Sequence, residues 1–101
     1  MKKQEEIKKE IDSQLYRRLM YRYFRMNEWP YASSITYVKV FKQKDEITIE
    51  IETHRPGLLI GKAGKFFDGL QNFIAKETKE NIKYIIKECE LWLNLYTNKK
   101  L

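Results

Sequence analysis

Residues Arg55 to Phe67 read RPGLLIGKAGKFF and hold three of the chain's four glycines and one of its two prolines. The fourth glycine, Gly69, follows two residues later. Glycine is favoured where the backbone turns sharply or comes very close to a ligand. The stretch therefore predicts a tight turn, a contact surface, or both.

The residues on either side of this stretch predict two strands and a helix. Upstream, ITYVKVF (Ile35 to Phe41) and EITIEIET (Glu46 to Thr53) are rich in β-branched residues, and the KQKD between them predicts a hairpin loop. Downstream, apolar residues recur with helical spacing from Gly64 to about Thr78. Gly69 inside that helix costs about 1 kcal/mol relative to alanine, which indicates that a neighbouring group needs its missing side chain.

The two ends of the chain complete the expected topology. Apolar residues three and four apart predict a long helix from about Gln4 to Met26, and Pro30 follows in the loop that ends it. The pattern of residues 82–90 fits both a helix and a strand. A strand is favoured, because a two-stranded hairpin is only marginally stable alone and the preceding helices offer a crossover to a third, parallel strand. A short tail follows.

These elements predict an α+β fold with the order α-β-β-α-α-β. The sheet is expected to be three-stranded and mixed, with Ile47 to Ile51 in the central strand and helices covering one face. The length of 101 residues suits one small domain.

Charge and composition narrow the possible partners and compartments. The net charge of +6 favours polyanions such as nucleic acid. A single cysteine, Cys89, and a single histidine, His54, supply neither an internal disulfide nor a structural zinc site. The N-terminus lacks the apolar run of a signal peptide, and no stretch of 18 apolar residues is present. We therefore expect a soluble cytoplasmic protein that does not contact membranes.

The segment LLIGKAGKFFDGL (Leu58 to Leu70), together with the element order, resembles the I-G-x-x-G-x-x-I core of KH domains in their type II arrangement. The resemblance covers about Leu15 to Glu90. The chain most resembles the KH domain of the bacterial small-subunit ribosomal protein near the mRNA entrance. That domain carries Arg-Pro-Gly directly before its motif, which matches Arg55 to Gly57 here. This implies a single KH domain over residues 1–101, with its core at about 35–90.

The same resemblance implies a function, which is non-catalytic binding of single-stranded RNA without a cofactor. The loop is then expected to clamp about four nucleotides, as KH loops do. Single-stranded DNA, a ribosome or ribonucleoprotein particle, and a second copy of the chain are further partners that it allows.

The chemistry of the Gly61-Lys62-Ala63-Gly64 loop agrees with this expectation. Absent side chains let a sugar-phosphate backbone approach main-chain amides, and the helix that begins here adds its N-terminal dipole. Lys62 and Lys65 can neutralise phosphates. A Walker A loop is excluded, because Gly57 is one residue too near and Ala63 replaces the required serine or threonine.

Base recognition, by the resemblance, falls in an apolar groove between Leu58 to Ile60 and residues 82–86. The predicted RNA-binding residues are Gly61, Lys62, Ala63, Gly64, Lys65, Arg55, Leu59 and Ile60. No catalytic or metal-binding residue is predicted, because His54 and Cys89 lie in different elements and form no evident nucleophile–base pair.

Several alternatives stay open at this level. The glycines can serve only a helix–helix turn, the groove residues can be core, and Arg55 can bond a carbonyl instead of a phosphate. An arginine row at positions 18, 22 and 25 is either a nucleic-acid contact or a solvated face. The alternative function is a protein-interaction or assembly module, in which a surface near Trp29, Trp92 and Tyr96 binds a partner or a second copy.

Overall fold

The computed structural model describes residues 8–89. In chain order the elements are β1 (Lys9–Ile11), α1 (Gln14–Met26), the 3-10 turn η2 (Ala32–Ser34), β2 (Ile35–Gln43), β3 (Glu46–Thr53), α2 (Pro56–Ile60), the 3-10 turn η3 (Lys62–Gly64), α3 (Lys65–Thr78) and β4 (Asn81–Glu88). This order contains the predicted α-β-β-α-α-β sequence and places one additional strand before it.

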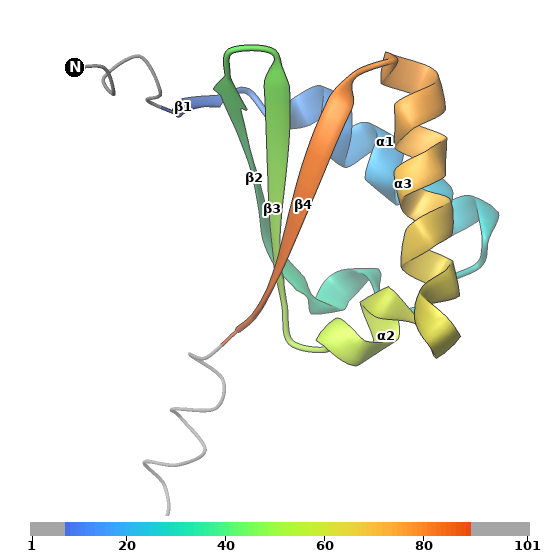
Figure 1. Ribbon diagram of the computed structural model, residues 1–101. Coiled ribbons are helices and arrows are strands. Elements are labelled where there is room, and N and C mark those ends of the chain that lie inside the picture. The colour runs from blue at the N-terminus through green and yellow to red at the C-terminus, as the bar shows by residue number, and fades with distance from the viewer. Residues whose placement is uncertain (1–7, 90–101) are drawn as a thin grey trace, which may run out of the picture.

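The four strands form one mixed sheet in the order β1-β2-β3-β4. The β1–β2 and β2–β3 pairs are antiparallel, whereas β3 and β4 are parallel. Helices α1 and α3 contact each other and lie on one side of the sheet (Figure 1). The predicted α+β class, the mixed sheet and the helical cover on one face are confirmed.

The final strand resolves the ambiguity of residues 82–90. β4 pairs with β3 over its whole length, with Ile82 opposite Ile47 and Ile86 opposite Ile51. Parallel neighbours cannot be joined by a hairpin, and α2 and α3 supply the crossover between them. Two predictions are therefore confirmed: β3 has a neighbour on each side, and β4 pairs with it in parallel. The strand ends at Glu88, slightly earlier than predicted.

Three features differ from the sequence-based predictions: the number of strands, the start of the first helix and the length of one connection. The sheet has four strands instead of three, because residues 9–11 pair with β2, where Ile11 lies opposite Val40. The first helix begins at Gln14 and not near Gln4, since the Asp12 carboxylate accepts the Gln14 backbone N–H at 3.1 Å and residues 9–11 are extended. The β2–β3 connection is also shorter than KQKD, because the strands extend inward and leave two residues between them.

The hydrophobic core lies between the sheet and the helices. Ile47, Ile49 and Ile51 of β3 are all at most 2% exposed, as their alternation predicts. They pack with buried residues from the other elements: Tyr16, Leu19, Met20, Phe24, Val38, Val40, Leu59, Leu70 and Ile74. No helix within residues 8–89 has both the length and the apolar character needed to cross a membrane.

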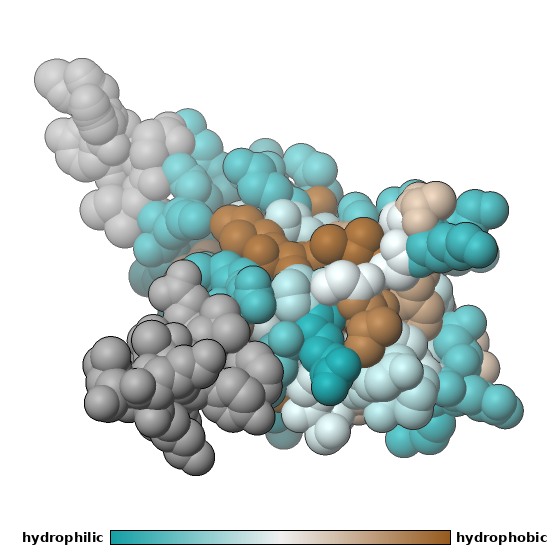
Figure 2. Space-filling view, turned by 90° about the horizontal axis from the view of Figure 1, so that it is seen from below, coloured by the Kyte–Doolittle hydropathy of each residue, from teal (hydrophilic) through white to brown (hydrophobic). Residues whose placement is uncertain are grey.

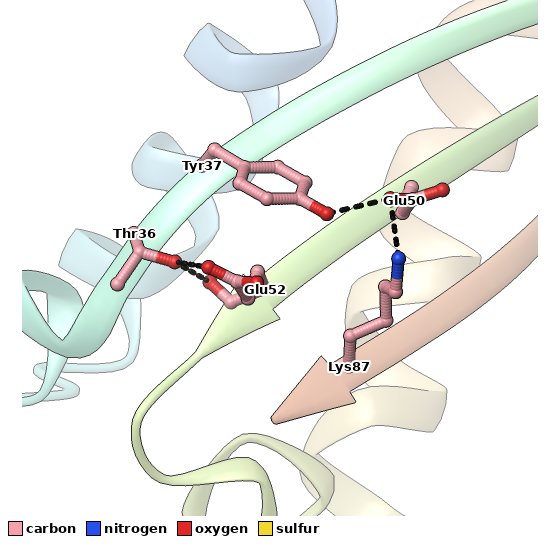
Figure 3. Close-up of polar contacts among 5 residues, drawn as sticks. All are labelled: Thr36, Tyr37, Glu50, Glu52 and Lys87. Atoms are coloured by element: carbon pink, nitrogen blue, oxygen red, sulfur yellow. Dashed lines mark hydrogen bonds and ion pairs between the residues drawn. The ribbon is translucent and has the colours of Figure 1, made fainter. Parts of the chain in front are cut away.

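The opposite face of the sheet carries a polar network instead of helices (Figure 3). The Tyr37 hydroxyl donates to Glu50 at 2.6 Å, and the Lys87 ammonium lies 3.3 Å from the same carboxylate. These two contacts, with the Tyr37 hydrogen bond first, hold the pKa of Glu50 below its ordinary value. Thr36 donates to Glu52 in the same way at 2.6 Å. The strand carboxylates therefore join neighbouring strands.

Tyr84 of β4 has a buried hydroxyl with no hydrogen-bond partner among the described residues. Burial raises the pKa of Tyr84 to about 12. The fold thus disfavours the phenolate, so this group's contribution to stability is present below the ordinary pKa of about 10 and is lost as the pH rises toward 12.

We expect Tyr84→Phe to stabilise the protein by about 1 kcal/mol at neutral pH, because it removes an unsatisfied buried hydroxyl and keeps the ring. The variant should also lose less stability between pH 10 and 12 than the wild type. Denaturant melts across this range measure both effects, with Tyr31→Phe, at a more exposed tyrosine, as the control. A variant with the wild-type pH profile would contradict the placement of Tyr84.

Candidate nucleic-acid interface

The turn between α2 and α3 depends on glycine at position 61. Gly61 has φ 84° and ψ 174°, a backbone conformation that is essentially restricted to glycine. A Cβ built there would lie 2.6 Å from the Phe66 Cβ and 3.0 Å from the Phe66 backbone nitrogen. Glycine is thus required at this position both by conformation and by space.

The loop then turns through a left-handed backbone at residues 63 and 64 and projects into solvent. Ala63 (φ 55°) and Gly64 (φ 75°) both have positive φ, and a Cβ at Gly64 would meet nothing within 4 Å. Lys62, Ala63 and Lys65 are exposed. The loop therefore presents main chain and two lysine side chains, with open space around them.

The N-terminus of α3 lies directly behind this loop. The helix begins at Lys65, and its N-cap residue, Gly64, has no side chain with which to cap the first turn. First-turn amides of a helix have no partner within the helix, and the helix dipole places partial positive charge there. Together with Lys62 and Lys65, these amides create an electropositive site, which Asp68 in the first turn of α3 reduces in part.

The apolar residues of α2 separate into a buried and an exposed set. Leu59 is 0% exposed and belongs to the core, so it supports the loop from below. It has no exposed surface for the RNA contact that was predicted from the sequence. Ile60 is 41% exposed and immediately precedes the loop. Leu58 is intermediate. Of the two apolar residues predicted to bind RNA, only Ile60 is available at the surface.

The second wall of the predicted groove is β4, which packs beside α2. Ile82, Tyr84 and Ile86 are partly buried against the core, and the Tyr84 ring meets the Phe67 ring edge-on at 5.3 Å. Figure 2, which faces the α2 end of the molecule, shows hydrophobic residues gathered across the middle and bordered by hydrophilic ones. The strand therefore contributes mainly to the core, with part of its apolar surface left accessible.

Arg55 is exposed at the start of α2. It lines a cavity of about 630 Å³ together with its chain neighbour His54 and residues from η2 and the loop before it: Pro30, Tyr31, Ser33 and Ser34. Within residues 8–89 no hydrogen bond joins the Arg55 side chain to a carbonyl, whereas its backbone N–H donates to the Thr53 hydroxyl at 3.1 Å. The guanidinium is thus available to an external anion.

Gly69 is explained by Tyr23, a residue that the sequence analysis did not assign to the site. The Tyr23 hydroxyl lies where a Cβ on Gly69 would be, and it donates to the Phe66 carbonyl oxygen at 3.0 Å. This bond ties α1 to the first turn of α3, directly behind the loop. The cost of a glycine within the helix indicated such a neighbour but not its identity.

The aromatic surface of the alternative function is only partly described. Trp29 is not a free surface residue, because it packs against Phe24 and Phe66 with ring centroids 4.4 and 5.2 Å apart. Trp92 and Tyr96 lie outside the described residues. Tyr31 is the more exposed neighbour, with its ring 5.6 Å from Trp29.

The histidine, the cysteine and the strand carboxylates within residues 8–89 lie in separate surroundings. No group of three histidine, cysteine or carboxylate side chains that could hold a metal ion occurs within residues 8–89. Cys89 is buried. His54 borders the Arg55 cavity, and Glu50 and Glu52 are engaged across the sheet.

Comparison with known proteins places the chain near one group. No protein-family model matches the sequence. It is 34% identical over 58 residues to small ribosomal subunit protein uS3 of Lactobacillus gasseri and 33% identical over 58 residues to uS3 of Syntrophomonas wolfei. It is 28% identical over 60 residues to small ribosomal subunit protein uS3c of Rhodomonas salina.

These matches cover 57–59% of the chain but only 26–28% of each relative. The similarity is thus to about a quarter of a longer protein. The chain therefore has weak homology to a segment of the ribosomal protein uS3.

Proposed function

We propose that this chain is a single type II KH domain that binds single-stranded RNA without catalysing a reaction and without a cofactor. The observation that carries the proposal is the loop of residues 61–65. It combines a glycine-only backbone conformation, exposed lysines and a helix N-terminus with no side-chain cap. This combination suits a phosphate backbone that packs closely against main-chain amides.

Each residue of the loop has a distinct role in this proposal. Gly61 and Gly64 keep the approach open, and Lys62 and Lys65 neutralise phosphates. Ile60, exposed beside the loop, contacts the base or sugar of a bound nucleotide. Arg55 pairs with a further phosphate at the start of α2, because its guanidinium is exposed and bonded to no described carbonyl.

The relatives support a nucleic-acid partner of this kind. They are named as proteins of the small ribosomal subunit, a particle that contains RNA. Since the chain matches only about a quarter of their length, association with a ribosome or another ribonucleoprotein is a proposal for this chain. Single-stranded DNA carries the same charged phosphate groups, so a parallel titration of RNA and DNA tetranucleotides decides between the two.

Affinity for a single-stranded tetranucleotide should fall steeply with salt. Each phosphate neutralised on a single strand contributes about −0.7 to the slope of log K against log salt. If Lys62, Lys65 and Arg55 each engage one phosphate, we expect a total slope of about −2 to −3. Fluorescence anisotropy at a series of salt concentrations measures it. A flat response would contradict phosphate binding and favour the protein-interaction module.

A further inference from the structure

Helix α1 carries an unusual concentration of positive charge. Its thirteen residues contain four arginines and no acidic residue: Arg17, Arg18, Arg22 and Arg25. All four side chains are exposed. The buried side of the same helix holds Tyr16, Leu19, Met20 and Phe24. Successive residues on a helix are rotated by about 100°, so the arginines form one continuous face that points away from the core.

This arginine face, defined as Arg17, Arg18, Arg22 and Arg25, borders a depression that an aromatic residue also lines. A depression of about 360 Å³ is lined by Gln14, Arg17, Arg18, Tyr21 and Arg25. Arg17 and Tyr21 also border a second depression of about 290 Å³, whose other residues belong to β2. The face therefore offers three guanidinium groups around a shallow depression on α1, and Arg17 continues it toward a second depression between α1 and β2.

An ordinary solvated face does not account for this arrangement. Solvent-exposed helices usually combine acids and bases three or four residues apart. Arg18, Arg22 and Arg25 instead place like charges at these spacings, which destabilises the helix. No ion pair or hydrogen bond joins the four side chains to any other residue in the described range 8–89. Their charge is thus available to an external anion.

The use of arginine throughout narrows the chemistry of that anion. The guanidinium is planar and binds phosphate through two parallel N–H bonds, and it also stacks on bases. Tyr21 adds an aromatic ring to the same surface. A string of phosphates at regular spacing fits a row of guanidinium groups along one helix face.

We propose that the arginine face is a second RNA contact surface, which binds the phosphate backbone of an RNA that extends beyond the segment held by the loop. This inference rests on the proposed function. The loop accommodates about four nucleotides, so an RNA that reaches both surfaces has to be longer. The arginine face thereby sets the preference for length and structure, whereas the loop holds one short single strand.

The test compares three RNA probes on one triple variant, Arg18→Gln/Arg22→Gln/Arg25→Gln. Glutamine keeps side-chain length and helix propensity. The probes are a single-stranded tetranucleotide, a single-stranded 20-mer, and a hairpin with a four-nucleotide single-stranded overhang. The first fits the loop alone, and the other two distinguish a single-stranded extension from a duplex.

We expect the triple variant to bind the tetranucleotide like the wild type. For the longer probe that contacts the arginine face, the slope of log K against log salt should be less negative for the triple variant than for the wild type. The expected difference is about 2 if the contacted RNA is single-stranded and about 3 if it is a duplex. The single variant Arg22→Gln should show about a third of that change. It keeps the test valid if the triple variant fails to fold, and circular dichroism checks the folding of both variants.

A matched control removes the same charge elsewhere, through Lys42→Gln/Lys76→Gln/Lys79→Gln at three exposed lysines outside the predicted groove. An equal change of slope in this control, or an unchanged slope of the triple arginine variant with both longer probes, overturns the inference. Failure of the proposed function is distinguishable, because it appears as a wild type that does not bind the tetranucleotide. The hairpin still reports on the arginine face in that case.

Discussion

Replacing Lys62 and Ala63 with aspartate should lower the affinity for single-stranded RNA at least about 100-fold. The change removes one cation and places two carboxylates in the path of the phosphate backbone. Loss of the Lys62 contact with phosphate, together with loss of one amide–phosphate contact that the carboxylates block, at roughly 1.5 kcal/mol each, corresponds to a factor of this size. The effect is expected to be large because the substitutions reverse the charge at the point of closest approach.

The double-aspartate variant should nevertheless remain folded. Lys62 and Ala63 are exposed, and Ala63 has φ 55°, a left-handed conformation in which aspartate is enriched. Surface substitutions of this kind usually change stability by less than about 0.5 kcal/mol. Anisotropy titration and a thermal melt of the same sample separate the two properties.

A matched control exists on α3, where Ala75 and Lys76 repeat the same residue pair at exposed positions. Ala75→Asp/Lys76→Asp changes the net charge equally and should leave the tetranucleotide affinity unchanged. If the Lys62→Asp/Ala63→Asp protein is folded and binds RNA with wild-type affinity, the glycines serve only the turn and the RNA-binding proposal fails.

Leu59→Ala is expected to cost about 2–5 kcal/mol of stability, the range for truncating a fully buried leucine. Substitution of the neighbouring Ile60 should affect RNA binding more than stability. Ile60→Asn affects a side chain that is 41% exposed, so we expect it to weaken RNA binding while stability changes by less than about 1 kcal/mol. Chemical denaturation and RNA titration of both variants measure the contrast.

The exposure of Ile60 is the reason for this difference between the two variants. With Ile60 buried, an asparagine there would have left its amide without a partner, and binding and stability would have fallen together. The structure removes that reason, because the amide of Ile60→Asn would reach solvent. A similar loss of stability in Leu59→Ala and Ile60→Asn would contradict the assignment of one residue to the core and the other to the surface.

The elements around the loop could be predicted because their patterns are strong. Strict alternation in β3 places Ile47, Ile49 and Ile51 on one side, and the structure buries all three. Periodicity alone leaves residues 82–90 open between a helix and a strand. Topology favours the strand, since a parallel partner for β3 needs a helical crossover such as α2 and α3 provide.

The N-terminal boundary could not be read from apolar spacing. Ile7 and Ile11 lie four apart, which continues the helical period of α1, yet Ile11 pairs with Val40 in the sheet. The stronger signal was Asp12-Ser13, a pair typical of helix starts, whose carboxylate binds the Gln14 N–H. Residues before 8 lie outside the described range.

The candidate site was predictable as a loop but not as a surface. α2 has only five residues, too few for periodicity to show which of Leu59 and Ile60 faces the core. The glycine at position 69 indicates a close neighbour, but Tyr23 lies far away in the chain, so no local pattern could identify it. Tertiary packing decides both features.

The most direct test of the central proposal is an NMR titration of the ¹⁵N-labelled protein with a single-stranded RNA tetranucleotide. If the loop clamps the phosphate backbone, the largest backbone amide shifts should fall on residues 61–65, with smaller shifts at Ile60 and Arg55. Saturable binding whose largest shifts lie elsewhere in the fold, or no shift at residues 61–65 at saturating RNA, would contradict it.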